Sequence, residues 1–458
     1  MIQYKKSLFV FRRDLRLEDN TALIAALANS EAVMPAFIFD PRQIGDQPYK
    51  SDSIVRFMLE SLIDLEDQLK TKGAKVYFFE GIAHEIIEKL LKLEEIDAVY
   101  VNRDYTPFSQ KRDQVIEGVC NKNGVKLHSL DDLMLNPPES VKKNDGGVYT
   151  IYTPYLRKAQ TLPVAEPISN NFRNYYKHPI KLENREIIRS FENKNKEIAF
   201  NPGGRKEALK ILKNLGEFKN YHEERNIPSL QATSKLSPHN KFGTCSIREI
   251  YQAIINKLGV DHTLIRELYW RDFFTQIGFY FPHVLGKSFH PRYDAIQWDN
   301  NPKLFKAWCE GKTGFPIVDA GMRELNQTGF MHNRVRMITA SFLVKDLHID
   351  WQWGEKYFAS KLVDYDPLVN NGNWQWVAST GCDAQPYFRV FNPWLQQEKF
   401  DPKALYIKKW VLELKDAQVS AIHQIEKKGC AFKEYPSPIV WHEGEKASAL
   451  RAFRSLDK

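Results

Sequence analysis

One short segment places four side chains capable of ligand binding on a single predicted helix, at residues 329–337. On a helix, Asn333 and Arg336 lie three residues apart on one face, and Arg334 and Met337 lie three apart on the neighbouring face. An amide, two guanidinium groups and a thioether could therefore face two different partners. A surface helix with solvated arginines is the alternative, and spacing alone favours it.

A second segment combines acids, amides and indoles. Asp364 and Asp366 come first, and Asn370, Trp374 and Trp376 follow closely. Burying so many polar groups costs free energy unless each one finds a hydrogen-bond partner. A loop with Asx turns and a helix cap is the alternative, because Asp and Asn favour both. The two tryptophans favour a buried cavity, since a solvated turn has no use for indole surface.

A third segment, residues 233–238, carries hydroxyl groups and a lysine just before a predicted helix. Its hydroxyls, its backbone N–H groups and Lys235 could together bind a phosphate. A simple N-cap is at least as well supported by the spacing. The three segments together predict a polar, aromatic-rich ligand cavity, and they leave the ligand open.

Composition narrows the class of protein. The chain of 458 residues is 43% hydrophobic and 27% charged, which is typical of a soluble globular protein with about two to three domains. No stretch approaches the ~18 uncharged apolar residues of a membrane span, and the first residues show no signal-peptide pattern. The 5 cysteines occur singly, without a CxxC pair, which predicts a cytoplasmic protein with reduced thiols and no metal site.

The net charge is weak evidence for a partner, whereas the distribution of tryptophan distinguishes two parts of the chain. Lys and Arg number 65 against 57 acids, for a net charge of +8, which is compatible with a polyanionic partner and also common among cytoplasmic enzymes. All 10 tryptophans lie between Trp270 and Trp441. The C-terminal part of the chain is therefore chemically unlike the N-terminal part.

The elements that must position these residues fall into two classes. In the first ~130 residues β-rich runs alternate with amphipathic stretches, which predicts a parallel α/β sheet. Strands are expected at 7–11, 33–39, 75–79, 98–102 and near 126–128, and helices at 21–28, 54–69, 83–93 and 109–123. The turn after the first strand, residues 12–16, lacks GxGxxG, so the sheet should be Rossmann-like without a standard dinucleotide fingerprint.

Regular periodicity fades between residues 136 and 204, where Pro137-Pro138 and the Asn-Asp-Gly-Gly run at 144–147 predict turns in a long surface connection. Beyond Arg205 the spacing of apolar residues is helical, which predicts an all-α domain large enough for a deep ligand cavity. The expected organisation is an α/β domain at 1–132, an interdomain linker at 133–203 and an all-helical domain at 204–458.

Several long motifs, in order along nearly the whole chain, resemble the DNA photolyase/cryptochrome family. The first is FRRDLR-x-x-DN at 11–20, and the others lie at 308–322, 331–353, 364–381 and 388–401. The resemblance implies an N-terminal antenna domain and a larger all-α domain that binds FAD. Within the family, the sequence is most similar to the cyclobutane pyrimidine dimer photolyases. This similarity implies that light excites reduced FAD, which donates an electron to a dimer flipped out of UV-damaged DNA and so splits it.

The resemblance also implies the FAD-binding positions. Arg336 and Asp364 match a buried ion pair beside the isoalloxazine ring, with Asp366 nearby. Asn370 matches the residue that faces flavin N5, where an amide can donate or accept. The other matched positions are Tyr221, Thr233, Ser234, Lys235, Leu236, Ser237, Asn333 and Tyr365.

Catalytic and DNA-binding positions follow in the same way. Trp374, Trp351 and Trp298 match an electron-transfer chain from the surface to the flavin, with ordinary core packing as the alternative. The positions that match the dimer pocket are Glu267, Trp270, Asn333, Arg334, Met337 and Trp376. Its tryptophans would stack on the pyrimidines, and its glutamate would hydrogen-bond their polar edges. The positions that match contacts to the DNA backbone are Arg225, Arg271, Arg334 and Gln396.

Three departures from the family pattern are present: Phe330 for Trp, Lys235 for Arg, and the sequence of residues 364–369. None removes a group that the chemistry requires. A (6-4) photoproduct photolyase is an alternative, although those enzymes place a histidine pair where this chain has Asn333-Arg334. A cryptochrome photoreceptor is another, but it typically carries a long C-terminal tail, whereas this chain ends soon after its last helix.

A flavin redox enzyme that acts on a small molecule is the alternative outside the family. The lesion-pocket residues and the lack of a second nucleotide motif count against it. Residues 40–42 and 102–107 resemble the edge of an antenna site, for which folate, deazaflavin or no chromophore all stay open. The protein is expected to be a monomer with UV-damaged DNA as its partner.

Overall fold

The computed structural model describes residues 2–45, 47–189 and 202–456. The chain forms two compact units. The first contains Met1–Lys219 and Ser234–Pro282, and the second contains Asn220–Thr233 and His283–Lys458. The boundaries expected at residues 132 and 204 follow the sequence pattern and stay a prediction.

The first unit is built on a sheet of five parallel strands in the order β3-β2-β1-β4-β5. The strands are β1 (Tyr4–Phe11), β2 (Ser30–Phe39), β3 (Tyr77–Glu80), β4 (Ala98–Asn102) and β5 (Lys126–Leu130). In the middle of the sheet Leu8 lies beside Met34 on one side and Val99 on the other. The predicted Rossmann-like sheet is confirmed, and its central strands are apolar because both faces are covered.

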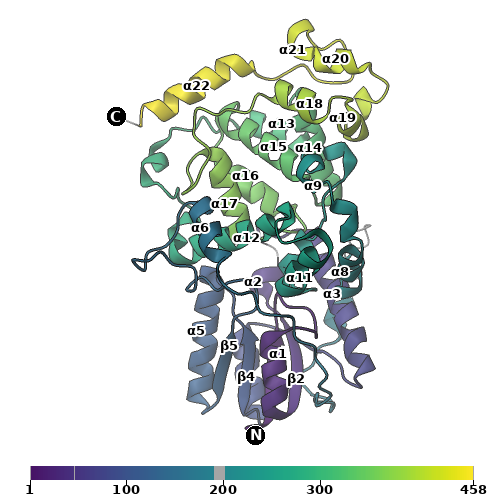
Figure 1. The fold of residues 1–458 in the computed structure, drawn as a ribbon, viewed down its shortest axis with the longest axis vertical. Helices are drawn as coiled ribbons and strands as arrows, with labels where there is room; N and C mark the ends of the chain where they lie inside the picture. The colour runs from purple at the N-terminus through teal and green to yellow at the C-terminus, as the bar shows by residue number, and fades with distance from the viewer. Residues whose placement is uncertain (1, 46, 190–201, 457–458) are drawn as a thin grey trace. The chain divides into compact units, whose positions relative to one another are not determined.

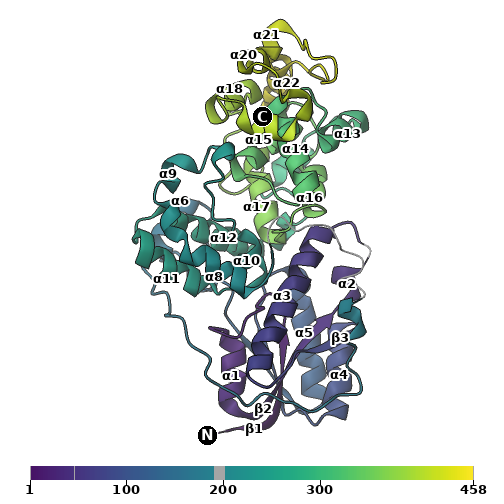
Figure 2. The ribbon, with the colours of Figure 1, turned by 90° about the vertical axis from the view of Figure 1, so that its right-hand side faces the viewer.

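Helices cover both faces of the sheet: α1 (Thr21–Asn29), α3 (Asp52–Thr71), α4 (Ala83–Leu93) and α5 (Pro107–Lys122), with a short α2 (Pro41–Ile44). Apolar side chains of α4 and α5 form one cluster with Leu8, Val10 and Val99. In Figure 2, α1 lies on the opposite side of the strands, and Figure 1 shows it in front of β2 and β4. The strand order reverses between β1 and β4, which is where open α/β sheets have a ligand-binding crevice.

The connection after the sheet contains a helix that periodicity did not predict, α6 (Tyr152–Ala159). Tyr152 and Tyr155 are buried on it, and the Tyr155 ring lies 5.3 Å from that of Phe273. The expectation of an irregular stretch is corrected here, because two turns with few apolar residues carry too little periodicity to detect. Residues 190–201 of the predicted linker lie outside the described residues.

The first unit also contains α8 (Arg205–Lys213), α10 (Ser237–Phe242), α11 (Ile247–Leu258) and α12 (Thr263–Tyr280). A buried ion network joins α11 to the sheet part of the unit. Asp132 accepts hydrogen bonds from Arg16 at 2.6 Å and from Arg248 at 2.8 Å, and Arg248 also bonds Asp19 at 2.8 Å. Each buried charge thus has an opposite partner, which the low-dielectric interior requires.

The second unit contains helices joined by loops and no strand among its described residues, as predicted. Its helices are α9 (Tyr221–Glu224), α13 (Pro302–Glu310), α14 (Pro316–Thr328), α15 (Asn333–Lys345), α16 (Trp351–Ala359), α17 (Pro367–Ala378), α18 (Pro393–Phe400), α19 (Leu405–Trp410), α20 (Val419–His423), α21 (Ile425–Lys428) and α22 (His442–Arg454). One apolar core runs through α14–α17 and includes Trp308, Trp351 and Trp374. Within the described part of the chain, no helix is long and apolar enough to cross a bilayer.

Candidate active site

The beginning of α15 presents the first group of predicted side chains. Its N-cap is His332, whose Nδ1 accepts the Arg334 N–H at 3.2 Å. Burial and the neighbouring Arg336 and Arg334 lower the pKa of His332 to about 4, so the imidazole stays neutral and Nδ1 remains an acceptor. The predicted helix is confirmed, and it places Asn333, Arg334, Arg336 and Met337 in its first two turns.

The predicted ion pair is formed in the second unit. Arg336 Nη2 lies 2.9 Å from Asp364 Oδ2, and Nη1 lies 3.2 Å from Oδ1. Arg336 Nε donates to the Met331 carbonyl at 2.7 Å. The side chain of Asp364 is 5% exposed and that of Arg336 is 24% exposed. A bidentate pair of this kind holds both groups in a defined geometry.

The segment after Asp364 caps α17 and carries the predicted site residue Asn370. Asp366 caps α17 by accepting the N–H groups of Leu368 at 3.1 Å and Val369 at 3.3 Å. Asn370 lies on the first turn of α17, and its Nδ2 donates to the Glu355 carbonyl at 3.2 Å. No hydrogen bond to Asn370 Oδ1 is found within the described residues, so this amide retains an acceptor.

Two of the three predicted electron-transfer tryptophans lie in the apolar core. Trp351 begins α16 and Trp374 lies on α17, and each is 2% exposed. Trp298 is partly buried and packs against the same core. The helices approach closely at Gly354, where an added Cβ would lie 2.2 Å from Trp374 Cη2. The absence of a side chain at residue 354 therefore makes the slot for the Trp374 ring.

Gly354→Ala is expected to displace Trp374 and to destabilise the protein by about 1–3 kcal/mol, because overpacking forces the ring and helix apart. Urea unfolding measures the loss. Gly118→Ala is the matched control, since Gly118 lies exposed on α5 with nothing within 4 Å of the added Cβ, and this change should stabilise slightly. Equal stability of the two variants would contradict the slot.

In the first unit, three predicted residues lie together on α12. The Trp270 ring stacks on Tyr152 at 3.5 Å between centroids and 9° between planes. Glu267 lies one turn before Trp270, and both are partly buried. Arg271 Nη1 donates to the Leu133 carbonyl at 2.6 Å, so this guanidinium already has a partner within its own unit. Its predicted contact with DNA stays a prediction.

The predicted phosphate segment has the backbone geometry of an anion nest. Lys235 has φ of +53°, and Leu236 has φ of −76° and ψ of −9°. Consecutive left-handed and right-handed residues turn their N–H groups toward one side, which forms a concave anion-binding surface. Ser234 Oγ accepts the Leu236 N–H at 3.4 Å, and Ser237 adds a second hydroxyl group at the edge of the nest. The donor set therefore fits the diphosphate of a dinucleotide such as FAD.

The second unit carries a basic cluster. Arg334 donates to Asn226 Oδ1 at 2.7 Å, and its guanidinium carbon lies 4.4 Å from the centroid of the Phe400 ring. Burial and the nearby charge of Arg225 lower the pKa of Arg334. Arg225 in turn lies 5.7 Å from the ring of Tyr221. The two positive charges repel each other, and a nearby anion would relieve this repulsion.

Other predicted residues of the second unit are placed as follows. Trp376 and Met337 are partly buried at the edge of the main core, as is Tyr365. Gln396 lies on α18, and its Oε1 is buried without a hydrogen-bond partner in the described part of the chain. Thr233 precedes the nest and is partly buried.

Two buried acids near the predicted residues, Glu324 and Glu355, were not singled out from the sequence. Glu324 Oε2 accepts a hydrogen bond from the Tyr406 hydroxyl at 2.5 Å and from the His332 N–H at 3.3 Å. Glu355 accepts from Asn371 Nδ2 at 3.1 Å, and burial raises its pKa to about 7. An acid on the apolar face of an amphipathic helix is the signal that could have found both.

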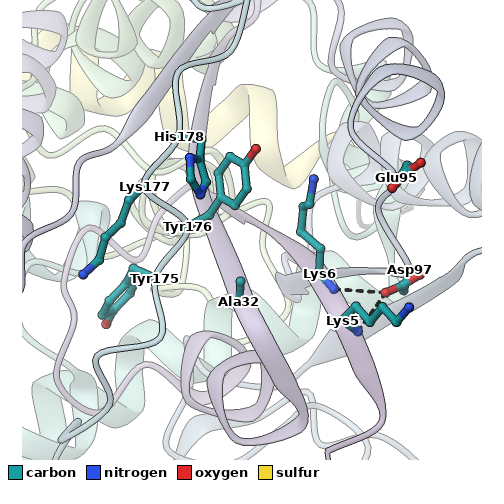
Figure 3. Close-up of a pocket in the computed structure, with 9 residues that line it drawn as sticks. All are labelled: Lys5, Lys6, Ala32, Glu95, Asp97, Tyr175, Tyr176, Lys177 and His178. Atoms are coloured by element: carbon teal, nitrogen blue, oxygen red, sulfur yellow. Dashed lines mark hydrogen bonds between the residues drawn. The ribbon is translucent and has the colours of Figure 1, made fainter.

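A surface pocket of about 530 Å³ lies in the first unit, near the start of β1 and β2. Figure 3 shows Lys5, Lys6 and Asp97 on one side and Tyr175, Tyr176 and His178 on the other. The backbone N–H groups of Lys5 and Lys6 donate to Asp97 at 2.8 and 3.0 Å. None of the predicted site residues lines this pocket.

Comparison with known families identifies both halves of the sequence. Residues 7–169 match the DNA photolyase profile, and residues 264–455 match the profile of the FAD binding domain of DNA photolyase. A deoxyribodipyrimidine photo-lyase of Alkalihalophilus pseudofirmus is 36% identical, over 98% of this chain and 98% of its own. That of Escherichia coli is 35% identical, again over 98% of each chain.

Solved structures of photolyases and of a cryptochrome are similar to this chain. An archaeal photolyase from Sulfolobus tokodaii with two FAD molecules is 44% identical, with a TM-score of 0.89 over 98% of this chain and 100% of its own. A class III photolyase from Agrobacterium tumefaciens is 33% identical, with a TM-score of 0.87 over 100% and 98%. A cryptochrome from Synechocystis is 27% identical, with a TM-score of 0.88 over 99% of each chain.

Proposed function

Because this chain belongs to the DNA photolyase/cryptochrome family, we propose that it uses FAD and light to repair cyclobutane pyrimidine dimers in DNA. Its relatives with the name deoxyribodipyrimidine photo-lyase match it over nearly their full length. The observation that carries the proposal is the start of α15, where Asn333 and Arg334 adjoin the Arg336–Asp364 pair. One helix would thus carry the lesion-binding pair beside the arginine of the flavin-binding pair.

When bound and reduced, FAD supplies the photoexcited electron that splits the cyclobutane ring. The protein supplies position and electrostatics. The nest at Ser234–Ser237 would bind the diphosphate, the Arg336–Asp364 pair would hold the ring system, and Asn370 would present its amide to it. Tyr221, Thr233, Tyr365 and Asp366 would complete the flavin-binding set.

The lesion would be held by stacking and hydrogen bonds. Trp270 and Trp376 would stack on the flipped pyrimidines, and base–aromatic stacking stabilises binding by about 1–3 kcal/mol per base. Glu267 and Asn333 would bond the polar edges of the bases, and Met337 would form an adaptable wall. Arg225, Arg271, Arg334 and Gln396 would contact the backbone, which positions DNA without reading sequence.

Repair of two oligonucleotides tests the function. One carries a cyclobutane thymine dimer and the other a (6-4) photoproduct, and each is incubated with reduced, FAD-loaded protein in the dark and under blue light. We expect light-dependent restoration of the dimer alone. Restoration of the (6-4) substrate would contradict the substrate class. Repair of neither substrate, with FAD bound and reducible by light, would indicate a cryptochrome.

Arg334→Ala is expected to weaken DNA binding and to reduce the slope of log K against log[salt] by about 0.9, the value for one lost phosphate contact. Titration of damaged duplex at several salt concentrations measures both. Asn226→Ala is the control, because it removes the partner of Arg334 and keeps the charge. An unchanged salt slope in Arg334→Ala would contradict the phosphate contact.

We further propose that a second flavin serves as the antenna chromophore. The Sulfolobus tokodaii relative supports this proposal, since its structure holds two FAD molecules. Charged residues follow the ends of β1 and β4 and could contribute to such a site; among them Arg13 lies 3.2 Å from Asp104. A ratio of acid-released flavin to protein near two would support this proposal, and a ratio near one would contradict it. A monomeric state and a cytoplasmic location stay predictions.

A further inference from the structure

The stretch Lys345–Asp350, here called the connector, contacts elements that carry all three predicted electron-transfer tryptophans. It runs from the last residue of α15 to the N-cap of α16 within the second unit. Asp350 caps α16 by accepting the Gln352 N–H at 3.0 Å, directly beside Trp351. Lys345 Nζ donates to Ser379 Oγ at 3.2 Å, at the end of the helix that carries Trp374.

The connector also fixes the backbone at Trp298. His348 is left-handed, with φ of +50°, and its carbonyl accepts the Asp299 N–H at 2.9 Å. Asn300 Oδ1 accepts the Asp350 N–H at 2.9 Å. Because Asp299 directly follows Trp298, these two hydrogen bonds hold the loop of Trp298 against the residues that begin at Trp351.

The C-terminal helix α22 is tied to the connector by three side-chain contacts. Asp346 Oδ1 lies 2.5 Å from His442 Nδ1, and both side chains are fully buried. His348 Nε2 lies 2.8 Å from Glu445 Oε2. Lys345 Nζ lies 3.5 Å from the centroid of the Phe453 ring. Contacts near both ends of α22 thus fall on three residues of the connector, Lys345, Asp346 and His348.

Phe453 on α22 contacts the side chain of Trp298 directly. Its ring meets the Trp298 ring edge-on, with centroids 6.5 Å apart and planes at 75°. It also stacks on Tyr387 at 5.7 Å and 11°. Trp298 is therefore held in two ways. The neighbouring Asp299 N–H bonds the His348 carbonyl, and the Trp298 ring contacts the Phe453 ring. Helix α22 carries Phe453 and also contacts His348 through Glu445.

We propose that His348 and Phe453 are positioning residues for Trp298, and that docking of α22 on the connector sets the rate of light-driven reduction through the tryptophan chain. Splitting of the dimer by enzyme that is already reduced does not use this path and is unaffected. The proposal rests on the proposed function, because it requires Trp298 to be part of the electron-transfer chain.

Two variants and a matched control test the proposal in FAD-loaded protein. Phe453→Ala removes the contact with the Trp298 ring. Glu445→Gln removes the carboxylate that contacts His348, and the Glu445 side chain is partly exposed. Glu443→Gln makes the same chemical change two residues away, where the side chain is 51% exposed and contacts only Lys446 in the described structure. The rate of FAD reduction under blue light with an external thiol is measured for each.

We expect photoreduction to slow by about tenfold or more in Phe453→Ala and by less in Glu445→Gln, because a misplacement of about 1 Å can cost 10²-fold. Glu443→Gln should match the unchanged protein. Repair by chemically pre-reduced enzyme should be equal in all four. A second readout is hydrogen exchange of the peptide that contains Asp299, with and without FAD, which should be faster in Phe453→Ala and Glu445→Gln.

The outcomes distinguish failure of the positioning role from failure of the electron-transfer chain or of the repair function. Unchanged photoreduction and exchange in both variants, with Trp298→Phe blocking photoreduction, would overturn the positioning role alone. Normal photoreduction in Trp298→Phe would overturn the electron-transfer chain and the positioning role with it. Absence of repair by pre-reduced unchanged protein would instead overturn the proposed function.

Discussion

Arg336→Leu is expected to abolish FAD retention and to destabilise the FAD-free protein by about 3–5 kcal/mol, the usual cost of leaving one partner of a buried pair uncompensated. The reason is the environment of Asp364, whose side chain is 5% exposed and bonded to both terminal nitrogens of Arg336. Flavin absorbance after gel filtration measures retention, and urea unfolding of the FAD-free protein measures stability.

Two controls separate charge from geometry. Arg336→Leu combined with Asp364→Leu removes both charges, so it should recover much of the stability without recovering FAD, since apolar replacement of a buried pair is often neutral. Arg336→Lys keeps the charge and loses the fork, so it should bind FAD weakly. Full FAD content in Arg336→Leu would contradict the flavin-binding role of this pair.

Glu267→Ala is expected to lower light-driven repair by about ten- to a hundredfold while FAD stays bound, because a hydrogen bond to a charged group contributes about 1.5–3 kcal/mol. Glu267 lies on α12 one turn from Trp270, and the nest proposed to bind the FAD diphosphate lies on another segment. Repair of a dimer oligonucleotide by pre-reduced protein measures the effect, with flavin absorbance recorded on the same samples.

Asp261→Ala is the matched control for Glu267→Ala, since Asp261 is an exposed acid just before α12, and its removal should leave repair unchanged. Glu267→Gln should retain part of the activity, because an amide still forms hydrogen bonds. Loss of flavin in parallel with loss of repair would place Glu267 in the flavin pocket and contradict its assignment to the lesion.

Local sequence determined the sheet and most of the helices. Alternating β-rich and amphipathic runs located all five strands, because strand and helix periodicities depend on neighbours close in the chain. The same principle placed Asn333 and Arg336 on the first turns of α15. It also left the role of Asp366 open, and the structure makes this residue the N-cap of α17. Two turns of α6 were too short and too polar to detect.

The family resemblance supplied assignments that spacing could not. The Arg336–Asp364 pair joins α15 to a loop beyond α16, and no local pattern indicates which acid meets which arginine. The structure confirms that these two side chains pair. The roles of Glu267, Trp270 and Asn370 stay predictions, since the position of a side chain on its helix does not by itself determine what it binds.

The sequence by itself determined the fold class, the family and the side chains available for chemistry, because these depend on periodicity and on motifs of neighbouring residues. Only the tertiary structure decided that Gly354 makes the slot for Trp374, that Glu324 lies beneath the cap of α15, and that α22 returns to the connector beside Trp298. Such contacts join residues far apart in the chain, and their geometry depends on how whole helices pack.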